Sequence, residues 1–247
     1  MKAAEMSLDH PLPGNGIKHL ILIGACYLDT ILTVPHFPEE DSKLRATSLQ
    51  VRRGGNCPNT LEVLQQLLLS PSSSSGEVST TTTTPRLYLV ATLPGRQTTA
   101  TRRILSSFGV SSSIDFSHCL YREGYDEPAS SYIIRSEDTQ SRTIVNFNEL
   151  PEMTEDEFVN MASGFAGRDD EQGGGGSDCW WHFEGRIPST TLRCIHHLRK
   201  YLPESKISVE VEKPNRQGLE ELASEADVVF YSRSWAELGG IPGQRHV

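Results

Sequence analysis

The chain has 247 residues, a length that suits one large domain or two small ones. Hydrophobic residues make up 36% and charged residues 22%, which is enough for a packed core, and the formal net charge of −9 argues against a non-specific nucleic-acid or membrane binder. No uncharged apolar run reaches the roughly 18 residues that a membrane-spanning helix needs, because the best candidate, residues 20–28, stops at Asp29.

The amino-terminal segment, residues 1–16, lacks the apolar core of a signal peptide and is predicted to be a disordered leader. The five cysteines are scattered and form no CxxC pair, so neither a disulfide framework nor a zinc ribbon is expected. The chain also has no N-x-[ST] glycosylation site. These features favour a reducing compartment and predict a cytoplasmic protein.

The first half of the chain begins with short apolar runs that are typical of strands. The apolar run at residues 19–28 predicts a buried parallel strand that ends near Gly24, and further strands are expected at 31–34, 44–51 and 86–93. A helix is predicted after residue 56, because Leu61, Leu64 and Leu68 share one face and Pro58 suits the first turn. A second helix is predicted over residues 98–110, ending at Gly109.

The second half alternates more regularly between strand and helix patterns. Residues 130–138 and 141–148 predict a hairpin, and Thr154 with Glu157 predicts a capping box at a helix start. Beyond it we expect strands at 179–185, 206–214 and 227–232 and helices at 188–201 and 218–226. This alternation favours a doubly wound α/β sheet, and the early paired strands and the hairpin indicate a small β flap on it.

Two low-complexity segments interrupt the pattern. Residues 70–85 are rich in serine and threonine, and residues 167–178 are rich in glycine and acidic side chains. Neither can bury an apolar face, so both are predicted to be flexible surface insertions.

Polar residues gather where the predicted strands end, which is where ligands bind in such sheets. Asp29, Asp41, Asn56 and Asn59 offer carboxylates and amides that suit sugar hydroxyls, and Gly54 and Gly55 allow close backbone approach. The P-loop and dinucleotide fingerprints are absent. Taken singly, these residues are also explained as turn and cap residues. Further polar residues at strand ends or in the hairpin are Arg142, Glu184, Arg186, Glu210, Glu212 and Lys213.

Six segments agree in order with a known family. The stretch GACYLDT and the motifs PEEDSKLR, RRGGN, SRTI, EGR and VEVEKP resemble the PfkB, or ribokinase-like, carbohydrate kinases, with the ketohexokinase (fructokinase) branch as the nearest. The resemblance covers about residues 17–238. It implies a ribokinase-like doubly wound sheet with a β lid that often forms a homodimer. It also implies transfer of the ATP γ-phosphoryl group, with Mg²⁺, to a hydroxyl of fructose or a similar ketose.

The resemblance assigns roles by position. It implies that the sugar is held by Asp29, Asp41, Gly55, Asn56 and Asn59. Arg142 is expected near the phosphates, where a guanidinium stabilises developing charge, although a surface hairpin arginine is the alternative. The nucleotide and metal side is expected to be bordered by Glu184, Arg186, Glu212 and Lys213, for which strand-end ion pairs are almost as good an explanation.

The chain departs from the family pattern in one respect. These kinases carry a late D-T-x-G-A-G-D segment, whose glycines form an anion hole at a helix start and whose last Asp is the catalytic base. The only superficial match, GGGGSD at residues 173–178, precedes a strand and is interpreted as a linker. We therefore expect residues 17–247 to be the amino-terminal portion of such a kinase, with no catalytic base and little activity alone.

That departure has several explanations that the sequence leaves open. The chain can be a truncated product, an alternative isoform or an incomplete gene model. As a molecule, it can be a non-catalytic sugar-binding or dimerising module, or a chain that does not fold stably because a sheet edge and one helix layer are uncovered.

Overall fold

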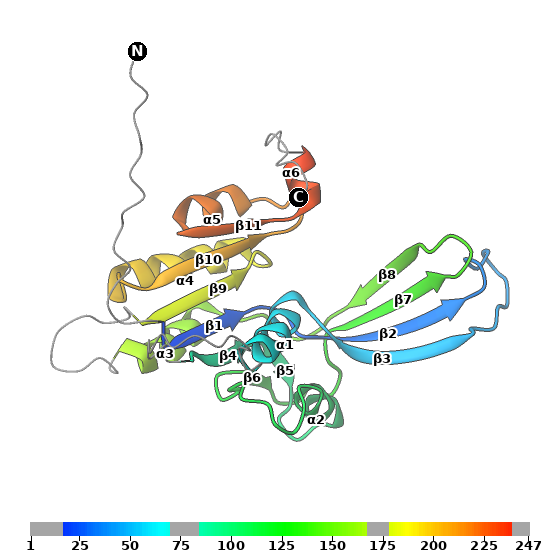
Figure 1. The fold of residues 1–247 in the computed structure, drawn as a ribbon, viewed down its shortest axis with the longest axis horizontal. Coiled ribbons are helices and arrows are strands. Elements are labelled where there is room, and N and C mark those ends of the chain that lie inside the picture. The colour runs from blue at the N-terminus through cyan, green and yellow to red at the C-terminus, as the bar shows by residue number, and fades with distance from the viewer. Residues whose placement is uncertain (1–16, 70–83, 167–177, 239–247) are drawn as a thin grey trace, which may run out of the picture.

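The computed structural model describes residues 17–69, 84–166 and 178–238 (Figure 1). Within them, five strands form a parallel sheet in the order β11-β10-β9-β1-β4. β1 lies between β4 and β9, with His19 in register with Arg86 on one side and Cys179 on the other. The strands are β1 (His19–Ile23), β4 (Arg86–Val90), β9 (Cys179–Glu184), β10 (Lys206–Val211) and β11 (Val228–Tyr231).

Helices cover both faces of this sheet because alternate residues of each strand point to opposite sides. Leu22 of β1 packs with the buried side chains of α1 (Asn56–Leu69) and α2 (Thr99–Ser106). Ile21 and Ile23 belong to the other core, with α3 (Glu155–Ala166), α4 (Pro188–Tyr201) and α5 (Leu219–Glu225). The prediction of a doubly wound α/β sheet is confirmed.

A second sheet extends away from the body as a lid (Figure 1). Its order is β3-β2-β7-β8, with β2 parallel to β7 and the outer pairs antiparallel. The predicted hairpin is its β7–β8 pair, so both the hairpin and the β flap are confirmed. The strands are β2 (Tyr27–Val34), β3 (Ser48–Gly54), β7 (Ser130–Ser136) and β8 (Arg142–Phe147).

Some element boundaries differ from the predictions. The run at 86–93 splits into β4 and β5 (Thr92–Pro94), because β5 leaves the main sheet to pair with β6 (Leu120–Arg122). The strand expected from residue 44 begins at Ser48, where pairing with β2 starts. A short helix, α6 (Arg233–Leu238), was not expected. Most of each low-complexity segment, residues 70–83 and 167–177, lies outside the described residues.

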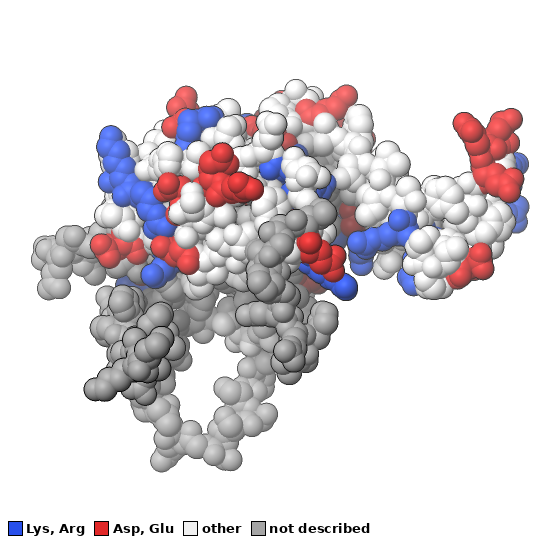
Figure 2. Space-filling model, turned by 90° about the horizontal axis from the view of Figure 1, so that it is seen from above, with Lys and Arg blue, Asp and Glu red and all other residues white. Residues whose placement is uncertain are grey.

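The capping box at the start of α3 is confirmed: the Thr154 amide donates to Oε2 of Glu157 over 3.0 Å, and the Glu157 amide donates to Oγ1 of Thr154 over 3.3 Å. Among the described residues, no helix is long and apolar enough to cross a membrane. Figure 2 shows acidic side chains gathered at the free end of the lid, where the β2–β3 and β7–β8 connections carry Glu39, Glu40, Glu137 and Asp138.

Candidate functional site

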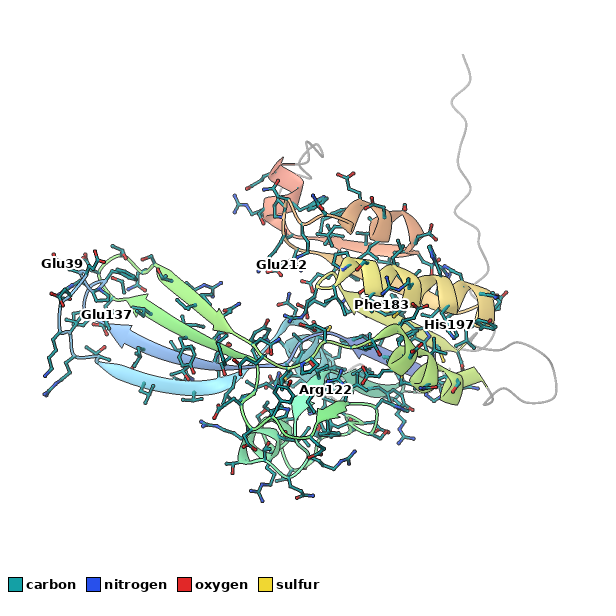
Figure 3. The ribbon with its side chains drawn as sticks, turned by 180° about the vertical axis from the view of Figure 1, so that it is seen from behind. Glu39, Arg122, Glu137, Phe183, His197 and Glu212 are labelled. Atoms are coloured by element: carbon teal, nitrogen blue, oxygen red, sulfur yellow. The ribbon has the colours of Figure 1, made fainter. Side chains whose placement is uncertain are left out.

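The carboxyl ends of β1, β9 and β10 meet the root of the lid and the first turn of α1 at one edge of the parallel sheet (Figure 1). Ligands bind at this edge in open α/β sheets. Glu212, which follows β10, lies on the side of the body that faces the lid (Figure 3). The predicted site residues that these elements carry are Asp29, Gly55, Asn56, Asn59, Glu184, Arg186, Glu212 and Lys213.

Gly54 and Gly55 are required by contacts within the chain itself. A Cβ at Gly54 would lie 2.4 Å from Oδ2 of Asp29 and would displace that carboxylate. Gly55 has a φ of 105°, and a Cβ there would lie 2.2 Å from the carbonyl oxygen of Ala25. The two glycines therefore let Asp29 and the turn after β1 pack against the start of α1.

Asp29 lies on β2 directly opposite Arg52 on β3. Nε of Arg52 lies 3.9 Å from Oδ2 of Asp29, and the two side chains are 57% and 13% exposed. An ion pair with so exposed an arginine is weak. A carboxylate offers about four acceptor positions, so Asp29 keeps the capacity to accept hydrogen bonds from a ligand.

Asn56 begins α1 and connects it to β10. Its Nδ2 donates to Oε1 of Glu210 over 2.8 Å. Burial raises the pKa of Glu210, the hydrogen bond from Asn56 opposes the rise, and the Glu184 and Glu212 carboxylates add to it. Glu210 thus fixes the position of Asn56 from a strand 154 residues away.

Glu184 ends β9 and accepts a hydrogen bond from the Ala25 amide over 2.7 Å. Burial raises the pKa of Glu184, and the Ala25 amide opposes the rise. Burial also raises the pKa of the Cys57 thiol, and Glu184 and Glu210 raise it further. The edge of the sheet therefore holds two carboxylates whose charged forms are disfavoured by burial.

Asn59 lies in the first turn of α1, and its Oδ1 accepts a hydrogen bond from Nη1 of Arg53 over 3.3 Å. The Arg53 side chain is only 4% exposed and pairs with Glu62. Its Nε donates to Oγ of Ser107 over 3.0 Å, and its guanidinium carbon lies 3.9 Å from the centre of the Phe108 ring. Asn59 itself is exposed, so its amide faces solvent from a rigid support.

Arg186 joins the root of the lid to the loop before α3. Its Nη1 donates to Oη of Tyr27 over 2.5 Å, and its guanidinium forms an ion pair with Glu152. The strand-end ion pair that the sequence left open for this residue is therefore formed. A phosphate group that approached Arg186 would compete with Glu152.

Asp41 and Arg142 lie at the far end of the lid, apart from the other predicted residues. β2 and β3 run side by side over seven residue pairs, about 20 Å at 3.4 Å per residue, and Asp41 lies in the connection beyond them. Arg142 begins β8 opposite Arg135 at the same end. The expectation that these two join the sugar and phosphate residues is not met within a single chain, because the lid extends away from the body (Figure 3).

Comparison with known proteins finds similarity to sugar kinases in sequence and in fold. No family model matches the chain. The chain is 28% identical to mouse ketohexokinase over 232 residues, which cover 89% of this chain and 65% of that protein. A ribokinase structure from Giardia lamblia matches 93% of the chain, and 62% of its own, with a TM-score of 0.62 and 14% identity. The chain has the ribokinase-like fold.

A ribokinase from Arabidopsis thaliana, solved with ribose and ATP, shares this ribokinase-like fold with a TM-score of 0.60 and 14% sequence identity, over 93% of this chain and 65% of that one. The predicted resemblance to the PfkB, or ribokinase-like, carbohydrate kinases and to ketohexokinase is thereby confirmed. The chain spans just under two thirds of the length of the mouse ketohexokinase it matches, at 65%.

Several residues of this candidate site were missed by sequence reasoning. Arg53 contacts Asn59 six residues along the sequence, but also Ser107, 54 residues away. Tyr27 and Glu152 contact Arg186, which lies 159 and 34 residues from them in the sequence, so no local pattern identifies them. Glu210 stands at a predicted strand end, but the sequence indicates no partner for it. Nη1 of Arg216 donates to the carbonyl oxygen of Gly185 over 2.7 Å, beside Glu184.

Glu212 and Lys213 follow β10, and Lys213 is exposed. The carbonyl oxygen of Glu212 accepts a hydrogen bond from Oγ of Ser232 over 2.5 Å, which holds the segment after β10 against the end of β11. In the part of the chain that the structure describes, no group of three His, Cys, Asp or Glu side chains could hold a metal ion.

Proposed function

We propose that this chain carries the sugar-binding part of a ketohexokinase-like kinase, whose family reaction is ATP-dependent phosphorylation of a sugar hydroxyl. The observation that carries the proposal is the packing of Asp29 against Gly54 beside the first turn of α1, where Asn56 and Asn59 stand. Carboxylate and amide groups together satisfy the donors and acceptors of a polyol. The similarity to mouse ketohexokinase over 89% of the chain supports fructose or a similar ketose as the ligand.

Calorimetric titration of the purified chain with fructose, ribose and glycerol tests the proposal. Asp29→Asn keeps the shape of the side chain but removes its charge, so we expect at least a tenfold loss of fructose affinity, about 1.4 kcal/mol. Asp138→Asn, on the exposed β7–β8 connection, is the matched control and leaves binding unchanged. Heat from none of the sugars, or equal affinity in both variants, overturns the proposal.

ATP and Mg²⁺ enter the proposal as cosubstrates of the family reaction. The described residues fit them incompletely, since Arg186 is paired with Glu152 and no metal cluster is present among those residues. Mg²⁺ in phosphoryl-transfer sites is held largely by substrate phosphates with one or two carboxylates, and Glu212 is our candidate. The 247 residues contain no D-T-x-G-A-G-D motif, so we expect sugar binding without phosphoryl transfer. Sugar-dependent ADP release above a blank contradicts that expectation.

A second candidate function is self-association through the lid. The lid exposes several large apolar side chains, a composition that marks interaction surfaces: Leu49, Tyr132, Ile144, Val145 and Phe147. Light scattering across a concentration series tests it. We expect a dimer in the parent chain and a monomer in Val145→Lys, whereas Val63→Lys on the exposed side of α1 serves as the control. A monomeric parent excludes this candidate.

A further inference from the structure

The two asparagines of the first turn of α1 contact partners of opposite chemistry. Nδ2 of Asn56 donates to Glu210, and Oδ1 of Asn59 accepts from Arg53. A carboxylate only accepts hydrogen bonds and a guanidinium only donates them. The orientation of each amide therefore follows from the chemistry of its partner, which removes the usual ambiguity between the oxygen and nitrogen of an amide.

Arg53 is held too firmly to adjust to the other orientation of Asn59. Its three guanidinium nitrogens contact Ser107, Asn59 and Glu62, and the ring of Phe108 covers one face. The side chain is 4% exposed, so its donors cannot turn toward water without losing protein partners. If Asn59 were flipped, its amide nitrogen would face a buried guanidinium that has no acceptor.

Asn56 is constrained in the opposite sense. Glu210 lies among other acidic groups, Glu184 and Glu212, and a carbonyl oxygen turned toward it would add a further acceptor to an acidic cluster. Asn56 and Asn59 are three residues apart, so their side chains lie on the same face of α1. One face of the helix thus carries two amides: Asn56 uses its Nδ2 for Glu210 and leaves its Oδ1 for a ligand, whereas Asn59 uses its Oδ1 for Arg53 and leaves its Nδ2.

We propose that Glu210 and Arg53 fix these amides in opposite orientations, so that Asn56 presents its Oδ1 acceptor and Asn59 its Nδ2 donor to one bound sugar. Arg53 and Glu210 are then positioning residues, and the site prefers a ligand with one hydroxyl that donates to Asn56 and one whose oxygen accepts from Asn59. The sugar half of this inference rests on the proposed function, whereas the amide orientations rest on the contacts alone.

Aspartate substitutions separate the two amides because aspartate has the shape of asparagine but no donor. Asn59→Asp faces Arg53 with a carboxylate, so a charge-assisted hydrogen bond replaces a neutral one. We expect an unchanged or higher melting temperature and at least a tenfold loss of fructose affinity. Asn56→Asp places a carboxylate against Glu210, and we expect the melting temperature to fall by about 5 °C.

Two further variants complete the experiment. Adding Glu210→Gln to Asn56→Asp supplies an amide donor to the new carboxylate and should restore most of the lost melting temperature. Asn160→Asp, on the exposed surface of α3, controls for the added negative charge. Asn56→Asp and Asn59→Asp both place a negative charge in the first turn of α1. Any stabilisation by the helix dipole is therefore common to both variants and does not explain a difference between their melting temperatures.

The outcomes are separable. Melting temperatures in the reverse order, or equal losses in Asn56→Asp and Asn59→Asp, overturn the amide orientations whether or not sugar binds. Fructose affinity retained in Asn59→Asp shows that Asn59 serves as an acceptor and overturns its donor role. A parent chain that binds no sugar overturns the proposed function and the sugar half of this inference, and leaves the melting temperatures to decide the orientations.

Discussion

The backbone amide of Ala25 donates to Oε2 of Glu184 over 2.7 Å and joins the ends of two neighbouring parallel strands, β1 and β9. Gly24 makes this contact feasible, because a Cβ there would lie 2.6 Å from both Oε2 of Glu184 and Sγ of Cys57. The turn after β1, the end of β9 and the start of α1 are therefore packed against one another without space for side chains at the glycines.

Gly55→Ala should be among the most destabilising single substitutions in the chain. The added Cβ would meet the backbone oxygen of Ala25 at 2.2 Å, and the φ of 105° is unfavourable for alanine. We expect a loss of about 3 kcal/mol or more in the free energy of unfolding, measured by urea denaturation. Gly164→Ala in α3, where a Cβ has no neighbour within 4 Å, should instead gain about 0.5–1 kcal/mol. Equal effects at the two positions would contradict the packing described for the turn after β1.

Glu184→Gln should stabilise the chain more at pH 7.5 than at pH 4. Burial raises the pKa of Glu184, so the folded state binds its proton more tightly than the unfolded state does. The parent therefore has its full stability from this group below about pH 4.5, and loses it as the pH rises through the folded-state pKa. Glutamine has no such ionisation. Urea unfolding at both pH values measures the difference, with Glu39→Gln at the lid end as the control; a difference that is larger at pH 4 would refute the assignment.

His182 should make the chain less stable in mild acid. Burial lowers the pKa of His182 to about 4. The Ser208 hydroxyl lies 2.9 Å from Nδ1 of His182 and can donate a hydrogen bond to the neutral ring. The same hydroxyl accepts a hydrogen bond from Nε1 of Trp180 over 2.8 Å. The residue also lines a groove of about 440 Å³ on the α1 side of the sheet. The contribution of the neutral His182 ring to the free energy of unfolding is thus fully present above pH 6.5. It is lost as the pH falls from 6.5 through 4.

The expected loss from His182 over that range is at most about 3 kcal/mol, since one unit of pKa corresponds to about 1.4 kcal/mol. His182→Asn keeps an acceptor near Ser208 but does not titrate. The change in the free energy of unfolding between pH 7.5 and pH 4.5 should therefore be smaller in this variant than in the parent. An identical pH dependence in both proteins would show that His182 is not responsible.

Local patterns predicted the elements well and the contacts between them poorly. The helix at 188–201 was predicted with its observed bounds, because Pro188 and the apolar spacing are local signals. The strand at 86–93 was predicted too long, because its break reflects a change of pairing partner, which no local pattern records. Asp29 and Asn56 could be grouped because both follow strand ends. Asp41 could not be placed, since the length and direction of the lid depend on how its strands pair.

The contact between Arg186 and Glu152 helps to attach the lid to the body. Arg186 holds Tyr27, the first residue of β2, and Glu152 lies in the loop before α3. Arg122 fixes that loop, because its guanidinium donates to the carbonyl oxygens of Pro151 and Glu152 over 2.9 and 2.8 Å. The lid is therefore tied to the body through a chain of three side chains.

Glu152→Gln should weaken this attachment by leaving the half-buried Arg186 without its charged partner. We expect a loss of about 1–2 kcal/mol in the free energy of unfolding and faster hydrogen exchange in β2 and β7, because the lid would open more often. Glu237→Gln breaks the exposed pair of Arg233 and Glu237 in α6 and should leave exchange in the lid unchanged. Exchange that is equally slow in β2 of the parent and of Glu152→Gln would show that the lid is held by its strand pairing and the Ala25 turn rather than by Arg186.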